Sequence, residues 1–256
     1  MTYLMFHFVF TLPAILLLAV TLPRPLAGIG DARARWAIPI LCAIAFSYTT
    51  PWDNFLVANS VWWYGPDRVI ATIGYVPVEE YMFFILQPIL TGLFLYHVLV
   101  RWPQPDRASS LAPHAVGCLF WLVVSAVSFY FLFEGPDDAF YLSLILAWAG
   151  PVLAGMWLYD GQTLWQKRRT MLVAVGIPTV YLWVADAIAI YSGIWTISSD
   201  YTLGLSVWTL PLEEATFFLV TNLLVVKGVL LFLFGDHQPV QQVERTLDET
   251  PEMAGS

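Results

Sequence analysis

The sequence predicts an all-α integral membrane protein with seven transmembrane helices, arranged as two parallel three-helix repeats joined by a connector helix. Three observations support this fold class. Apolar residues make up 59% of the 256 residues and charged residues only 12%, against about 45–50% and about 25% in soluble domains. Apolar stretches of about 20 residues, the length that spans a bilayer, recur along the chain. A motif with two adjacent glutamates occurs twice.

Seven apolar stretches account for most of the chain. They lie at roughly residues 3–22, 36–57, 78–100, 115–133, 139–158, 170–191 and 211–234. The first stretch lacks the positively charged start of a signal peptide, so we interpret it as a structural helix. The predicted units are repeat 1 at 1–100, a connector with the fourth helix at 101–138, and repeat 2 at 139–235. Residues 236–256 are polar and acidic, and we expect a disordered tail there.

Basic residues predict the orientation of these helices in the cell membrane. Nine lie in the loops after helices 1, 3 and 5 or in the tail, whereas the other face carries only Arg68. Cytoplasmic loops carry the excess of Lys and Arg. We therefore expect the N-terminus outside and the C-terminus in the cytoplasm. The nine are Arg24, Arg33, Arg35, Arg101, Arg107, Lys167, Arg168, Arg169 and Arg245.

Charge and residue spacing exclude several classes of function. The net charge is −8, and no basic stripe is present to neutralise phosphates, so we expect no nucleic-acid partner. Cys42 and Cys118 lie in apolar runs and have neither a metal-binding nor a disulfide-framework spacing. The histidines form no pair at i and i+4, so we expect no metal site. They are His7, His97, His114 and His237.

An internal repeat relates the two halves of the chain. The segment YVPVEEYMFF in the first half corresponds to TLPLEEATFF in the second, and an Asp and a Trp nine residues apart precede each segment. The first set is Asp53, Trp62, Pro77, Glu79, Glu80, Phe83 and Phe84, and the second is Asp186, Trp195, Pro211, Glu213, Glu214, Phe217 and Phe218. Tyr3-Leu4 likewise corresponds to Tyr141-Leu142.

The repeat explains why seven helices are expected. Two three-helix units joined directly would be inverted relative to each other, and one additional crossing gives them the same orientation. Both Pro-x-Glu-Glu segments then begin their helices at one face of the membrane. Six carboxyl groups would collect at that level, where they could share one cavity.

The six acids are the candidate catalytic residues. Acidic residues in a first helical turn also have a purely structural use, because they interact favourably with the helix dipole. That use does not require two adjacent acids in both repeats, and ionisable residues at membrane depth are functional by default. Burial and neighbouring negative charges favour protonated carboxyl groups, so such a cluster suits general acid and base chemistry. The candidates are Glu79, Glu80, Glu213, Glu214, Asp53 and Asp186.

Aromatic residues are the candidates for stabilising a cation. Each Phe-Phe pair lies one helical turn inward of its glutamates, and aromatic ring faces attract cations by about 0.5–2 kcal/mol. A belt of aromatic residues at the membrane interface is the structural alternative for the tryptophans. The predicted set is Phe83, Phe84, Phe217, Phe218, Trp62 and Trp195.

The doubled Pro-x-Glu-Glu motif, with its trailing Phe-Phe and preceding Asp and Trp, resembles the membrane, flavin-independent lycopene cyclase family. The chain is similar to the fused tandem form of the two small bacterial subunits, over about residues 3–235. Repeat 1 departs from repeat 2 where Ser60 replaces Gly193 and Asn54 replaces Ala187. The two halves have therefore diverged, and their acids can have different roles.

The resemblance implies a redox-neutral isomerase, an intramolecular lyase of carotenoid biosynthesis. An acid would protonate the terminal double bond of lycopene, the cation would close a six-membered ring, and a base would then leave a β-ionone ring, giving γ- or β-carotene. No cofactor is expected, and the chain has no Gly-x-Gly-x-x-Gly fingerprint for a dinucleotide. The expected partners are the lipid-soluble polyene and membrane lipids, with other carotenoid enzymes as further candidates.

Other functions remain open at the level of sequence. A cyclase of C50 carotenoids would share the motif. A seven-helix retinal-binding protein could use Lys227, although residue 223, one turn earlier, is a leucine rather than a carboxylate counter-ion. We expect Lys227 to extend toward the cytoplasm. A transporter is a further alternative, but the acids lie at helix ends rather than at broken helix middles.

Overall fold

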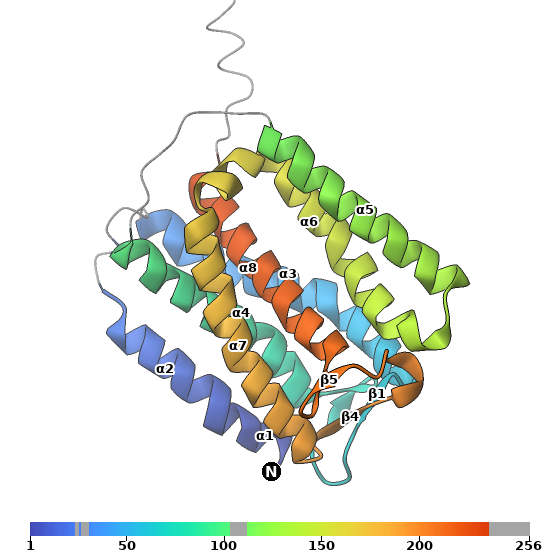
Figure 1. The fold of residues 1–256 in the computed structure, drawn as a ribbon. Helices are drawn as coiled ribbons and strands as arrows, with labels where there is room; N and C mark the ends of the chain where they lie inside the picture. The colour runs from blue at the N-terminus through green and yellow to red at the C-terminus, as the bar shows by residue number, and fades with distance from the viewer. Residues whose placement is uncertain (24–25, 27–30, 103–111, 236–256) are drawn as a thin grey trace, which may run out of the picture.

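The computed structural model describes residues 1–23, 26, 31–102 and 112–235. Long helices form a bundle, and the N-terminus lies at the same end as several short strands (Figure 1). We call this end the strand end. The predicted tail at 236–256 and the segments 24–25, 27–30 and 103–111 lie outside the described residues.

The first long helix is continuous but contains a wider π-helical turn. This turn precedes Pro13, which has no backbone N–H and whose ring crowds the preceding turn. A wider turn relieves that crowding. It also places His7, whose Nε2 donates to the backbone oxygen of Glu79 at 2.8 Å. The consecutive elements are α1 (Tyr3–Phe6), η1 (His7–Thr11) and α2 (Leu12–Thr21).

Within the described residues, six helices are long and apolar enough to cross a membrane, which makes this a membrane protein. They are the segment Tyr3–Thr21, α4 (Val78–Arg101), α5 (within Ala112–Glu134), α6 (Phe140–Gln166, preceded by η2, Asp137–Ala139), α7 (Arg168–Tyr191) and α8 (Leu212–Phe234). The seventh predicted span corresponds to α3 (Asp31–Ala58). It has 28 residues, but charged and polar side chains lower its hydropathy, and it is not among the six.

The helix α6 extends beyond the residue predicted as its end. The sequence predicts a helix ending near residue 158, whereas α6 continues to Gln166 through a break at Asp160, where φ is −155° and ψ is 71°. The Asp160 carboxylate accepts the backbone N–H of Thr163 at 2.9 Å. Because this bond caps the turn that follows, the chain resumes a helical conformation after the break.

The part of the chain that the structure describes contains six short strands in three antiparallel pairs. The helical pattern of the sequence did not predict them. The pair β1–β4 joins the loop before α4 to the loop before α8, with Trp63 opposite Thr196. Buried backbone groups need hydrogen-bond partners, and strand pairing supplies them in these loops. The strands are β1 (Trp62–Tyr64), β2 (Thr72–Ile73), β3 (Val76–Pro77), β4 (Trp195–Ile197), β5 (Ser206–Val207) and β6 (Leu210–Pro211).

The helices pack around a central group formed by α3, α4, α7 and α8. α2 packs on α4 and α6 packs on α8, while α3 contacts α8 and α4 contacts α7. α5 lies outside the group and packs mainly on α6 (Figure 1). Residues from the central helices form one apolar core, and two smaller cores lie nearer the strand end.

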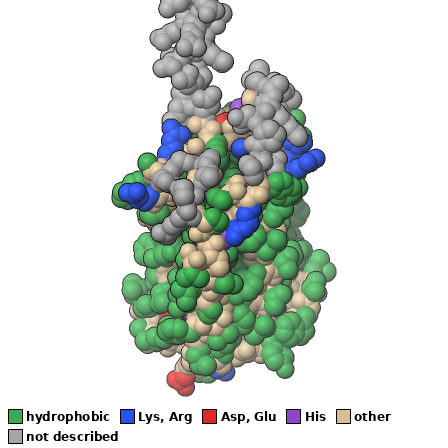
Figure 2. Space-filling view, turned by 90° about the vertical axis from the view of Figure 1, so that its left-hand side faces the viewer, with side chains coloured by type: hydrophobic (Ala, Val, Ile, Leu, Met, Phe, Trp, Pro, Cys, Tyr) green, Lys and Arg blue, Asp and Glu red, His purple; other side chains and the backbone are tan. Residues whose placement is uncertain are grey.

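Charged side chains lie mainly at the two ends of the molecule. Figure 2 shows Lys and Arg side chains gathered at the end opposite the strands, and a broad apolar surface below them. Arg68 lies at the strand end, where its guanidinium donates to the backbone oxygen of Met1 at 3.1 Å. The apolar surface between the ends suits contact with lipid.

Candidate active site

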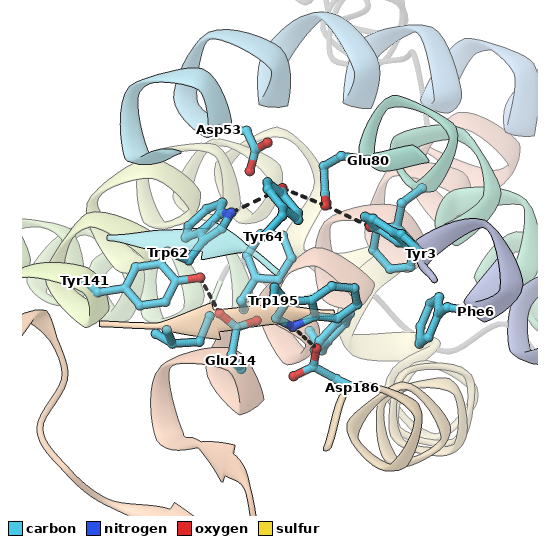
Figure 3. A pocket seen from close by; sticks show the side chains of 14 residues that line it. Tyr3, Phe6, Asp53, Trp62, Tyr64, Glu80, Tyr141, Asp186, Trp195 and Glu214 are labelled. Carbon is cyan, nitrogen blue, oxygen red and sulfur yellow. Dashed lines mark hydrogen bonds between the residues drawn. The ribbon is translucent and has the colours of Figure 1, made fainter. Parts of the chain in front are cut away.

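A cavity of about 40 Å³ lies between the helices at the strand end. Four carboxyl groups enter it, and aromatic rings form most of the remaining wall (Figure 3). We call it the acid cavity. Its lining residues are Tyr3, Phe6, Asp53, Trp62, Tyr64, Glu80, Phe83, Tyr141, Asp186, Trp195, Ile197, Glu214, Phe217 and Phe218.

The structure brings together most of the residues that the sequence singled out. Asp53 comes from α3, Glu80 from α4, Asp186 from α7 and Glu214 from α8, so both repeats contribute an Asp and a Glu. Five of the predicted aromatic residues also line the cavity. The predicted residues outside this lining are Glu79, Glu213 and Phe84.

The first glutamate of each pair binds the backbone of the loop that precedes its helix. Glu79 Oε1 accepts the N–H of Ile70 at 2.9 Å, and Glu213 Oε1 accepts the N–H of Leu203 at 2.8 Å. Neither glutamate is exposed. Adjacent residues on a helix point about 100° apart, so only one member of each pair can face the cavity. The first members therefore hold the loops in place.

The second glutamate of each pair accepts tyrosine hydroxyl groups inside the cavity. Glu80 Oε2 accepts from Tyr3 at 2.8 Å and from Tyr64 at 3.1 Å. Glu214 Oε1 accepts from Tyr141 at 2.6 Å. These bonds fix the carboxyl groups where they face a common space (Figure 3).

Tyr64 connects a tryptophan to the first of these glutamates. The indole N–H of Trp62 donates to the Tyr64 hydroxyl oxygen at 3.3 Å, and that hydroxyl donates to Glu80. Burial, together with the nearby Glu80 and Asp53, raises the pKa of Tyr64 well above its usual range. Tyr64 therefore remains a protonated hydrogen-bond donor throughout the physiological pH range.

The two aspartates keep carboxyl oxygens without protein partners. Asp186 Oδ1 accepts the indole N–H of Trp195 at 3.1 Å. Within the described part of the chain, Oδ2 of Asp186 and Oδ2 of Asp53 have no hydrogen-bond partner. Buried polar atoms without partners are rare and call for an explanation. Here they face a cavity, where a proton or a reacting molecule can be the partner.

Three tyrosines that were not predicted as site residues complete the site, namely Tyr3, Tyr64 and Tyr141. The correspondence between Tyr3 and Tyr141 in the repeat was the available signal, because the two have the same role toward Glu80 and Glu214. Tyr64 has no counterpart of the same chemistry, since Ile197 occupies the equivalent place in β4. The two halves of the cavity therefore differ in hydrogen bonding.

Aromatic rings form the inner floor of the acid cavity. The rings of Phe83 and Phe218 meet edge to face with centroids 6.0 Å apart, and Phe217 lies 5.5 Å from Phe218. Phe84 instead contacts Tyr81 at 5.6 Å, on another side of α4. The floor of the acid cavity therefore contains both phenylalanines of repeat 2 but only Phe83 of repeat 1, because helical geometry turns adjacent residues apart.

Lys227 lies far from the four acids and inside the protein. Its ammonium group lies 5.3 Å from the Trp121 ring centre and 5.1 Å from that of Trp157, and the residue is 2% exposed. The expected extension toward the aqueous face is therefore wrong, because these two rings hold the side chain in the bundle. Glu214 is about 20 Å away along α8 at 1.5 Å per residue. Its carboxyl group is therefore too distant to be a Schiff-base counter-ion.

Comparison with known proteins identifies the family. The family profile described as lycopene cyclase matches residues 1–99 and 138–232. A lycopene beta-cyclase of Halobacterium salinarum is 41% identical over 224 residues, covering 84% of this chain and 93% of that protein. A bifunctional lycopene cyclase/phytoene synthase of Phycomyces blakesleeanus is 35% identical over 236 residues, covering 88% of this chain and 38% of that longer protein. No solved structure matches the chain significantly. The chain belongs to the lycopene cyclase family.

Proposed function

We propose that this protein is a lycopene β-cyclase that closes the linear ends of lycopene into β-ionone rings by proton transfer. The observation that carries the proposal is the acid cavity, in which the carboxyl groups of Asp53, Glu80, Asp186 and Glu214 face aromatic rings. Family membership and the 41% identical lycopene beta-cyclase support the choice of substrate.

The reaction begins with a carboxylic acid that protonates the terminal carbon–carbon double bond of the polyene. The resulting tertiary cation is attacked by the neighbouring alkene, and a six-membered ring forms. A carboxylate then removes a proton from the ring carbon next to the new cation and leaves the β-ionone double bond. One proton is gained and one is lost, so the product is an isomer of the substrate and no electrons are exchanged.

Glu80 and Glu214 exchange these protons in our proposal, and Asp53 and Asp186 tune them or receive the proton. The tyrosine hydrogen bonds support this assignment because they aim the two glutamates at the same space. Glu79 and Glu213 position the loops in front of the helices. Their bonds to Ile70 and Leu203 support that separate role.

The aromatic residues stabilise the carbocation while the ring closes. Ring faces within about 6 Å of a cation contribute about 0.5–2 kcal/mol each, with the larger values in dry sites. Phe83, Phe217 and Phe218 form the inner floor, and the rings of Trp62 and Trp195 line the same space. Such a surface provides no nucleophile that would trap the cation before the proton leaves.

We also infer that the chain contains two parallel three-helix repeats separated by α5 as a connector, with α3 as the seventh membrane-crossing helix. Equivalent packing supports this inference. α3 contacts both α4 and α8, and α7 contacts the same two helices. The basic residues at the end opposite the strands support an N-terminus outside the cell membrane and a cytoplasmic C-terminus.

Expression of the full chain in bacteria that accumulate lycopene tests the function. Chromatography of the extracted pigments is expected to yield γ-carotene or β-carotene without an added cofactor. Unchanged lycopene, in cells whose membranes contain the protein, would contradict the proposal.

A further inference from the structure

A second cavity lies deeper in the bundle, next to the acid cavity. Its volume is about 100 Å³, and its wall is almost entirely apolar. Phe83 and Phe217 line both cavities, so these two rings separate the deeper cavity from the acids. Along α8 its wall runs from Phe217 to Val225, about 12 Å at 1.5 Å per residue. An apolar chain whose end reaches the acids would therefore continue into this space.

A stack of four aromatic rings connects the surface between α3 and α6 to the acid cavity. Tyr48 stacks on Trp148 with centroids 5.1 Å apart, and Trp148 stacks on Trp52 at 4.9 Å. Trp52 in turn lies parallel to Phe217, with centroids 5.6 Å apart and an angle of 3° between the rings. Tyr48, Trp148 and Phe217 of this stack also line the deeper cavity, so dispersion contacts with an apolar polyene can accumulate along the stack.

The same side of the molecule has a hollow in its surface. A shallow hollow on α3 is lined by Ile40, Ala43, Ile44, Ser47 and Tyr48. Ile44 and Tyr48 also line the deeper cavity, and they are 56% and 42% exposed. The hollow therefore adjoins the deeper cavity, and only the partly exposed side chains of Ile44 and Tyr48 lie between the two.

The equivalent side of the other repeat has the same contact but lacks the stack. The Tyr48 hydroxyl donates to the backbone oxygen of Trp148 at 2.9 Å, and the Tyr181 hydroxyl donates to that of Phe10 at 2.7 Å. Tyr181 on α7 is equivalent to Tyr48 on α3, because the two are 133 residues apart in the sequence. The same offset relates Asp186 to Asp53. At the position equivalent to Trp52, α7 has Ala185, which cannot continue an aromatic stack.

We infer that the linear polyene enters from the lipid between α3 and α6 and remains bound there, with its reacting end in the acid cavity and its chain along the four-ring stack. This inference rests on the proposed function. A cavity of about 150 Å³ holds only one benzene, so the present space is too small for a C40 chain. Binding must therefore separate Tyr48 from Trp148 and widen the gap, while the rest of the chain extends into the bilayer.

A pair of matched substitutions tests this route. Ile44→Trp places a large ring in the cavity between α3 and α6, and Ile177→Trp places the same ring at the equivalent position on α7. The two isoleucines are 56% and 55% exposed, so neither substitution crowds a packed core. Steady-state cyclisation is measured with purified protein in lipid nanodiscs at several lycopene concentrations.

We expect Ile44→Trp to raise the KM for lycopene at least tenfold and Ile177→Trp to change it less than twofold. In a Glu214→Gln background, less lycopene should co-purify with the Ile44→Trp variant than with the Ile177→Trp variant. Equal KM values for both variants, or a larger effect of Ile177→Trp, would overturn the inference while leaving the cyclase function intact. Absence of cyclisation by the unsubstituted protein would instead refute the proposed function.

Discussion

Adjacent glutamates in this protein have different surroundings, and the difference separates two kinds of contribution to the site. Glu79 holds a backbone N–H of its loop, whereas Glu80 accepts two tyrosine hydroxyls within the cavity. Glu213 and Glu214 repeat this division. The sequence predicts that these residues cluster, because the motif is duplicated. It does not predict which member faces inward, since that depends on how each helix is rotated against its neighbours.

Replacing the cavity glutamates is expected to remove cyclisation. Glu80→Gln or Glu214→Gln keeps the size of the side chain but removes an exchangeable proton, and general acid–base catalysis contributes about 100- to 10,000-fold. We expect a loss of about 100-fold or more in kcat, measured by chromatography of the carotenoid products.

The matched controls are Glu79→Gln and Glu213→Gln. An amide oxygen can still accept the N–H of Ile70 or Leu203, so we expect less than about a tenfold loss, given about 1 kcal/mol for a hydrogen bond. Greater loss in these controls than in the cavity variants, at equal amounts of protein in the membrane, would reverse the proposed roles.

The tyrosine hydroxyls are expected to contribute unequally. Glu214 accepts one tyrosine hydroxyl and Glu80 accepts two. Tyr141→Phe should therefore reduce kcat by about tenfold relative to the unsubstituted protein, if the hydrogen bond is worth about 1.4 kcal/mol. Tyr64→Phe should reduce kcat by a smaller factor. Parallel kinetic measurements on the two variants decide this. Equal kcat values would show that the hydroxyls do not position the carboxyl groups.

At the scale of elements, the sequence predicts the long helices well and the loops between them poorly. Apolar length determines α4, α7 and α8 almost to the residue. The strands arise because the backbone of these loops pairs across repeats, as in β1–β4, and such pairing has no periodic signal in a stretch of three residues. This pairing places Tyr64 in the site, so its role has no signal in the sequence.

The ends of α3 and α7 offer a test of local structure. Ser60 and Gly193 have φ values of 58° and 64° and make the same turn, in which the following residue donates to a carbonyl five residues back. Glycine adopts this left-handed conformation without the cost of about 1–2 kcal/mol that a side chain adds. We expect Ser60→Gly to stabilise the protein by about 0.5–1 kcal/mol.

Gly193→Ser is expected to destabilise the protein by a similar amount. A thermal unfolding experiment in detergent should show midpoints shifted by about 2–4 °C per kcal/mol, upward for Ser60→Gly and downward for Gly193→Ser. If both midpoints moved in the same direction, the two helix ends would not be equivalent.

At the scale of the whole molecule, the duplicated sequence yields one shared site rather than two. Asp and Glu from each repeat reach the same cavity because β1 and β4 draw the two halves together at the strand end. Composition and the repeat are sufficient to predict a membrane bundle with clustered acids. The cavity between α3 and α6 was not predictable, because it depends on single differences between the repeats, such as Trp52 against Ala185.

The proposed orientation predicts which face each loop occupies. A single cysteine in place of Asp67, in a variant without Cys42 and Cys118, should react with a membrane-impermeant maleimide added to intact cells. A single cysteine in place of Arg168 should react only after the membrane is opened, because basic residues favour the cytoplasmic face. The reverse pattern of labelling would place the acid cavity at the cytoplasmic face.

Proton-initiated ring closure in the acid cavity is the central claim, and isotope incorporation tests it most directly. Purified protein would convert lycopene in D₂O, and mass spectrometry would measure the deuterium in each product. Because the carboxyl groups exchange their protons with solvent, γ-carotene should gain one deuterium and β-carotene two. Glu80→Gln or Glu214→Gln should form about 100-fold less of either product. Cyclised product without deuterium would contradict protonation by these acids.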